Sequence, residues 1–132
     1  YDDPVNLFVA KFLGTPPINV FQGKIKNGKV CIGDAAVLDA PGQKDRDVFV
    51  GIRPEGFLLK EDGPLICQLG GVEVMGRDIS IVSNHEASLN PNIRSIISAE
   101  TKVDTSSEIV RFAVKPSKLF VFDGSSEERI RI

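Results

Sequence analysis

The stretch INVFQGKIKNGKVCIG, residues 18–33, decides the fold of this chain. Two extended runs flank the pair Asn27-Gly28, which favours the two-residue turn of a β-hairpin because both residues tolerate positive φ. The stretch therefore predicts two antiparallel strands joined by a tight turn at residues 27 and 28.

The sequence beyond this hairpin continues in short apolar runs. In DVFVGIR, residues 47–53, Val48, Val50 and Ile52 alternate with other side chains at the period of a strand. Turn residues such as Asp62-Gly63 separate the later runs at short intervals. Many short strands at this spacing predict a mainly β chain that forms a closed or nearly closed small β-barrel.

Only the first segment has the period of a long helix. In DDPVNLFVAKFLG, residues 2–14, apolar side chains recur at helical spacing, and Asp3 and Pro4 suit the N-cap and the first helical position. We therefore predict one N-terminal helix. The chain opens on Tyr1 without an initiator methionine, so we also expect it to be a piece of a longer polypeptide.

Composition places the chain among ordinary soluble globular domains. Its 132 residues are 42% hydrophobic and 26% charged, with a formal net charge of -2. This charge provides no basic field for nucleic acid, and the absence of tryptophan removes the usual stacking platforms. No apolar run approaches the length of about 20 residues that crosses a bilayer. We expect no nucleic-acid partner.

Few side chains could carry metal or covalent chemistry. Cys31 and Cys67 each lie in an apolar run, which favours small buried side chains over a disulfide or a metal site. Together with His85, the one histidine, they are too few for a zinc site of four ligands. His85 lies in a polar stretch, and we expect it to be a solvated loop residue.

Motifs for nucleotide binding and for covalent catalysis are absent from the sequence. The Gly-Lys pair at 23–24 lacks the upstream glycine of a P-loop, and neither this pair nor the pair at 28–29 is followed by the required serine or threonine. No G-x-S-x-G, H-E-x-x-H or G-x-G-x-x-G pattern occurs either. We therefore expect no catalytic, metal-binding or cofactor-binding residue in this chain.

Four phrases, in order along nearly the whole chain, resemble one protein family. They are YDDPVNLFVAKFLGTPPINVF (1–21), VGIRPEGF (50–57), VEVMGRD (72–78) and VKPSKLFVFD (114–123). They are similar to the end of the ATPase domain and the C-terminal domain of carbohydrate-importer ABC proteins of the maltose-transporter type. The chain departs from that pattern at Gly56, often histidine in the family, and at Gly124, which follows Asp123 directly. The stretch around His85 matches no family phrase.

The resemblance implies a fold and a role. Residues 16–132 would be an OB-type regulatory domain, called TOBE, and residues 1–15 the terminal helix of a preceding ATPase domain or its linker. Such domains hold two copies of the ATPase subunit together as a homodimer and can receive a regulatory protein. The parent chain would bind ATP and magnesium and contact membrane-spanning subunits through its ATPase domain, peripherally at the cytoplasmic face of the cell membrane. The alternatives are a TOBE-type module that binds a small oxyanion and a stand-alone nucleic-acid binder.

Arg53, Pro54 and Glu55, within the second phrase, are the first candidate contact residues. Pro54 removes a donor from the strand ladder and biases Arg53 toward an extended conformation. We interpret the three residues as a corner in which Arg53 pairs with a carboxylate, either Glu55 or Glu73. The alternative is a contact of Arg53 with the partner subunit or the ATPase half. The remaining candidate contact residues are Gly76, Phe122 and Asp123.

Overall fold

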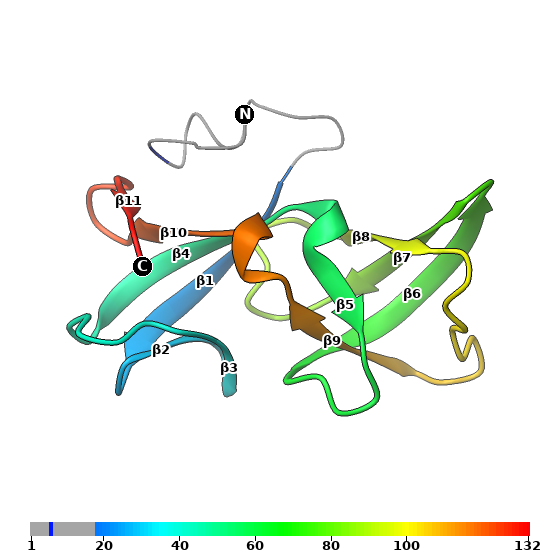
Figure 1. Cartoon of the computed structure of the whole chain (residues 1–132), viewed down its shortest axis with the longest axis horizontal. Coiled ribbons are helices and arrows are strands. Elements are labelled where there is room, and N and C mark those ends of the chain that lie inside the picture. Colours follow the sequence, from blue (N-terminus) through cyan, green and yellow to red (C-terminus); the bar gives the residue numbers. More distant parts are fainter. Residues whose placement is uncertain (1–5, 7–17) are drawn as a thin grey trace.

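The computed structural model describes residue 6 and residues 18–132, which form two antiparallel β-sheets side by side (Figure 1). The first sheet has the order β11-β10-β4-β1-β2-β3 and the second the order β5-β9-β6-β7-β8. The strands of the first sheet are β1 (Asn19–Lys26), β2 (Lys29–Ile32), β3 (Ala35–Asp39), β4 (Arg46–Ile52), β10 (Leu119–Asp123) and β11 (Arg129–Ile130). Those of the second are β5 (Phe57–Leu59), β6 (Leu65–Met75), β7 (Asp78–Asn84), β8 (Ile93–Ser98) and β9 (Ile109–Val114).

The second sheet curls into a nearly closed barrel, because its two edge strands, β5 and β8, contact each other. A bulge between Leu69 and Gly71 interrupts the pairing of β6 with β7, and such bulges bend a strand. The predicted OB-like, mainly β fold is therefore confirmed. The predicted helix lies outside the described residues, apart from Asn6, which forms an isolated antiparallel bridge with Glu128.

The hairpin at Asn27-Gly28 forms as predicted. Both residues have positive φ, 52° and 73°, as a type I′ turn requires. Gly23, near the point where β2 begins to pair with β1, is needed for a different reason. A Cβ atom there would lie 2.6 Å from the carbonyl oxygen of Cys31, so any side chain would push the two strands apart.

Alternation along the strands produces one main core between the sheets. In β4, Val48, Val50 and Ile52 face this core, whereas Phe49 faces the other side of the first sheet. A second, smaller cluster lies on that other side and consists of Ile18, Val20, Phe120 and Phe122, with Phe49 packed against it.

The chain passes between the sheets twice, each time through a one-turn 3-10 helix that begins with proline. The first, η1 (Pro54–Gly56), leads from β4 to β5, and the second, η2 (Pro116–Lys118), leads from β9 back to β10 (Figure 1). Proline suits the first position of such a turn because its fixed φ is already helical and its missing N–H is not needed there.

Residues 85–91, which we call the strap, follow β7 and lie along β1 of the other sheet. The backbone N–H of Gln22 donates to the carbonyl of Ala87, and that of Leu89 donates to the carbonyl of Val20, both at 2.8 Å. The strap thereby occupies the part of the β1 edge that β2 does not cover.

His85 at the start of the strap is a loop residue, as expected, but it is half-buried rather than solvated. Its Nδ1 atom accepts a hydrogen bond from the N–H of Ala87 at 3.0 Å, and its ring packs edge-on against Phe21, with 6.1 Å between the centroids. The expectation of a solvated histidine is wrong because the strap docks on β1, which composition alone does not reveal.

Candidate functional site

The corner at Arg53 is a junction between the two crossovers. The backbone N–H of Arg53 donates to the carbonyl of Lys118 at 3.0 Å, and the N–H of Lys115 donates to the carbonyl of Gly56 at 2.8 Å. A Cβ atom on Gly56 would lie 2.7 Å from the Cβ of Lys118, so glycine is needed for this close approach. Any side chain at position 56 would require Lys118 to shift.

Arg53 itself is 2% exposed, and it is engaged in an interaction in the structure. The ion pairs recorded between residues of the described ranges join Lys29 to Asp39 and Arg46 to Asp123, and the pairing of Arg53 with Glu55 or Glu73 stays a prediction. A charged side chain is rarely so deeply buried unless it forms hydrogen bonds or an ion pair. Burial therefore favours a structural role for Arg53 over a contact with another protein.

Asn19, at the start of β1, is a buried polar residue beside this corner. Its Nδ2 donates to the carbonyl of Ile52 at 3.1 Å and to that of Arg94 at 3.0 Å, while its Oδ1 accepts from the N–H of Arg94 at 2.9 Å. One amide side chain thus joins β1 and β4 of the first sheet to β8 of the second. In the sequence, Asn19 is part of the first family phrase, and no local pattern indicates this role.

Asp123 ends β10 and caps the turn that follows. One carboxylate oxygen accepts from the N–H groups of Ser125 and Ser126, at 2.8 and 2.9 Å, and the other accepts from Arg46 at 3.2 Å. These bonds lower the pKa of the Asp123 carboxyl to about 2, and the bond from the N–H of Ser126 has the largest effect. Next in the chain, a Cβ atom on Gly124 would lie 2.7 Å from the carbonyl oxygen of Asp47, which explains a glycine directly after the aspartate.

The other candidate residues lie apart from one another. Phe122 is fully buried in the second cluster and is the cross-strand neighbour of Phe49. Glu73 and Gly76 are exposed near the tip of the β6–β7 hairpin, where Gly76 has a φ of +66° in the turn. The structure therefore brings Arg53, Pro54 and Glu55 together at the crossover, and it does not unite the seven residues into one site.

An exposed apolar face was not anticipated from the sequence. Leu58 of β5, Ile66 of β6 and Ile109 of β9 point outward from the second sheet and are 36%, 45% and 46% exposed. Between them lies Arg111, whose Nε donates to the carbonyl of Gly63 at 2.9 Å. The signal was present in the sequence, because consecutive apolar residues in these strands place apolar side chains on both faces of a sheet.

The described residues contain few groups with chemical reactivity. No three His, Cys, Asp or Glu side chains among them are grouped so that they could hold a metal ion. Cys31 and Cys67 are free thiols, the first half-buried and the second buried, and burial raises the pKa of the Cys67 thiol to about 11. Within the described ranges, no helix has the length and apolarity needed to cross a bilayer.

Comparison with known proteins finds import ATP-binding proteins that match nearly the whole chain. It is 31% identical over 153 residues to the diacetylchitobiose uptake system ATP-binding protein MsiK of Streptomyces coelicolor, a match that covers 98% of this chain and 40% of that protein. It is 30% identical over 147 residues to the oligosaccharides import ATP-binding protein MsmX of Bacillus subtilis, covering 99% of this chain and 39% of that protein.

A third relative is the sn-glycerol-3-phosphate import ATP-binding protein UgpC of Ruegeria sp. (strain TM1040). The identity is 29% over 132 residues, which cover 98% of this chain and 36% of that protein. No protein-family model matches the chain. The chain thus spans little more than a third of the length of the curated relatives it matches. It is a homologue of the ATP-binding proteins of sugar-importing ABC transporters, and its β-fold is that expected of their C-terminal domain.

Proposed function

We propose that this chain is the regulatory and dimerising C-terminal domain of the ATP-binding subunit of an ABC importer for sugars. The observation that carries the proposal is the similarity, along nearly the whole chain, to import ATP-binding proteins of which it spans between 36% and 40%. In the proposed parent subunit, ATP and magnesium bind to another part of the polypeptide, because this sequence has no P-loop. The domain itself is not catalytic.

The outer face of the second sheet supports a role in protein contact. Apolar side chains around an arginine are typical of the centre of a protein interface, and carboxylates are depleted there. Leu58, Ile66, Ile109 and Arg111 have this character, and Ala113 extends the apolar surface beside Leu58. We assign this face to the contact between two copies of the subunit.

The proposed mechanism is mechanical. Each domain is stiffened by its paired crossovers and by the strap, so two domains in contact act as a fixed point while the attached ATPase halves open and close. The subunit would lie at the cytoplasmic face of the membrane and reach the membrane-spanning subunits through its ATPase part. A regulatory protein would bind to a surface outside the dimer contact.

The association state of the chain tests this proposal. We expect sedimentation equilibrium to show a dimer in the micromolar range and the double variant Ile66→Lys, Ile109→Lys to be monomeric. Val74→Lys is the matched control, because Val74 is 72% exposed at the hairpin tip and lies away from the outer face. A wild-type chain that stays monomeric at about 1 mM, a concentration that would detect even weak association, would refute dimerisation by this domain.

Retention of the dimer in the double variant would instead refute only the assignment of the face. Calorimetry with molybdate and sulfate tests the oxyanion alternative, and the proposal predicts no heat of binding.

A further inference from the structure

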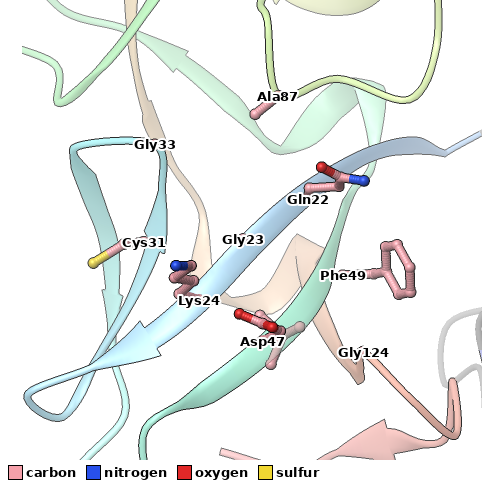
Figure 2. A pocket seen from close by; sticks show the side chains of 10 residues that line it. Gln22, Gly23, Lys24, Cys31, Gly33, Asp47, Phe49, Ala87 and Gly124 are labelled. Carbon is pink, nitrogen blue, oxygen red and sulfur yellow. The ribbon is translucent and has the colours of Figure 1, made fainter.

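A groove of about 510 Å³ lies on the first sheet, on the side away from the main core (Figure 2). Its floor is formed by β1 and β4, and its margins by Ala87 of the strap, Gly33 after β2 and Gly124 after β10. The volume falls within the range of roughly 300–1,000 Å³ that is typical of small-molecule sites. The groove is separate from the apolar face assigned to dimerisation, which lies on the second sheet.

Four side chains on the floor form two neighbouring cross-strand pairs. Gln22 lies opposite Phe49, and Lys24 lies opposite Asp47, in the antiparallel register of β1 and β4. Residues two apart in a strand share a face, so all four side chains stand on the same side of the sheet. Figure 2 shows an amide, an ammonium, a carboxylate and an aromatic ring along this floor.

The three polar side chains are not used in holding the fold. Lys24 and Asp47 face each other across the strands, yet neither belongs to a salt bridge of the described chain. The hydrogen bonds between described residues likewise include none from the side chains of Gln22, Lys24 or Asp47. Their hydrogen-bonding capacity is therefore directed to solvent or to a ligand.

Phe49 gives the groove a fixed apolar surface. The ring is half-buried because it packs against the second cluster, next to its cross-strand neighbour Phe122. Because the Phe49 ring is already restricted by its packing against the second cluster, it loses little side-chain entropy when a ligand packs on its exposed side.

The charges on the floor disfavour an anionic ligand. Directly opposed residues in an antiparallel pair have Cβ atoms roughly 4.5–5.5 Å apart, so an anion bound to Lys24 would also lie near Asp47. Attraction and repulsion of similar size, about 1 kcal/mol each in water at 4 Å, would nearly cancel. The groove is thus suited to a neutral ligand with many hydroxyl groups, which can donate to Asp47 and accept from Lys24 while Gln22 does either.

From these observations we propose that the groove over β1 and β4 binds a small neutral polyol of the saccharide class. One apolar C–H face of the sugar ring packs on Phe49, and the hydroxyl groups bond to Gln22, Lys24 and Asp47. This inference does not depend on the importer assignment, because it uses only the floor of the groove.

Titration of the isotope-labelled chain with maltose, followed by NMR chemical shifts, tests the proposal. We expect saturable shifts confined to the amides of residues 22–24, 47–49 and 87, and no comparable shifts with sodium sulfate. Asp47→Asn should weaken binding about tenfold or more, since a hydrogen bond to a charged acceptor is replaced by one to a neutral acceptor. Asp39→Asn is the matched control, because Asp39 is an exposed carboxylate of the same sheet outside the groove, and it should leave the affinity unchanged.

Three results would overturn the proposal. The first is the absence of saturable shifts at these residues up to about 100 mM maltose, which is far above the dissociation constant of any specific site. The second is an equal affinity of wild type and Asp47→Asn for maltose. The third is preferential binding of sulfate. Gln22→Ala provides a second variant in the groove that should fold normally, because the Gln22 side chain is exposed.

Discussion

Replacing Asn19 by alanine should destabilise the protein, because the Asn19 amide links β1 and β4 of the first sheet to β8 of the second by hydrogen bonds. The substitution removes two donated bonds, to the carbonyls of Ile52 and Arg94, and one accepted bond, from the N–H of Arg94. Each bond contributes about 1 kcal/mol net, and a buried group left without a partner costs about 1–3 kcal/mol. The two carbonyl oxygens can accept hydrogen bonds from other donors, whereas the N–H of Arg94 loses its acceptor and is left unsatisfied. We therefore expect the free energy of unfolding to fall by about 3–4 kcal/mol in total.

Urea unfolding at equilibrium measures this loss. With a slope of about 1–3 kcal/mol per molar, typical of small proteins, the midpoint should fall by more than about 1 M. Gln22→Ala is the control, since it removes an exposed amide from the same strand and should change the free energy of unfolding by less than about 0.5 kcal/mol. Hydrogen exchange should also accelerate at the amide of Arg94.

Asn19→Asp separates the accepted bond from the donated ones. The carboxylate keeps the bond from the N–H of Arg94 but faces the carbonyl oxygens of Ile52 and Arg94, so the variant should be less stable at pH 7 than at pH 3, relative to wild type. If Asn19→Ala lowered the free energy of unfolding by less than about 1 kcal/mol, the proposed coupling of the sheets through this side chain would be wrong.

Two further predictions concern the crossover and the buried thiol. Gly56→Ala should lower the free energy of unfolding in urea by about 1–3 kcal/mol, because the new Cβ would meet the Cβ of Lys118. Gly71→Ala is the control and should change this free energy little, since there is open space around its Cβ. Equal effects of the two substitutions would contradict the close approach at Gly56. The pKa of Cys67 is raised from 9.0 to about 11 by burial, so its stabilising contribution is complete below pH 9 and is lost as the pH rises through 11. The stability advantage of wild type over Cys67→Ala should therefore shrink by about 2 kcal/mol between pH 8 and pH 11, and a constant difference over that range would show that the thiol is not buried in solution.

Several features of the fold follow from local sequence. The turn at Asn27-Gly28 depends on two adjacent residues that tolerate positive φ, and the strands depend on alternation within a few residues. Pro54 and Pro116 similarly mark the points where a strand must end and the chain turns. The family resemblance was also visible, because its phrases are contiguous, and the curated relatives agree with it.

The candidate contact residues were less predictable. The chain order identified a corner at Arg53 but could not show that its backbone bonds to the second crossover at Lys118. It could not show either that Glu73 lies near the tip of a separate hairpin. Partner choice for a charged side chain depends on approach in space, and local spacing contains no information about it.

The amino-acid sequence by itself determined the strands, the tight hairpin and the similarity to the ATP-binding proteins of importers. Each of these depends on short-range conformational preference or on contiguous residues. Tertiary structure alone decided which strands are neighbours, where the strap docks and which side chains share the groove. Asn19 and Arg94, which bond to each other, are separated by 75 positions in the chain. Contacts at that separation arise only when burial of the shared core brings the sheets together, so no local pattern can specify them.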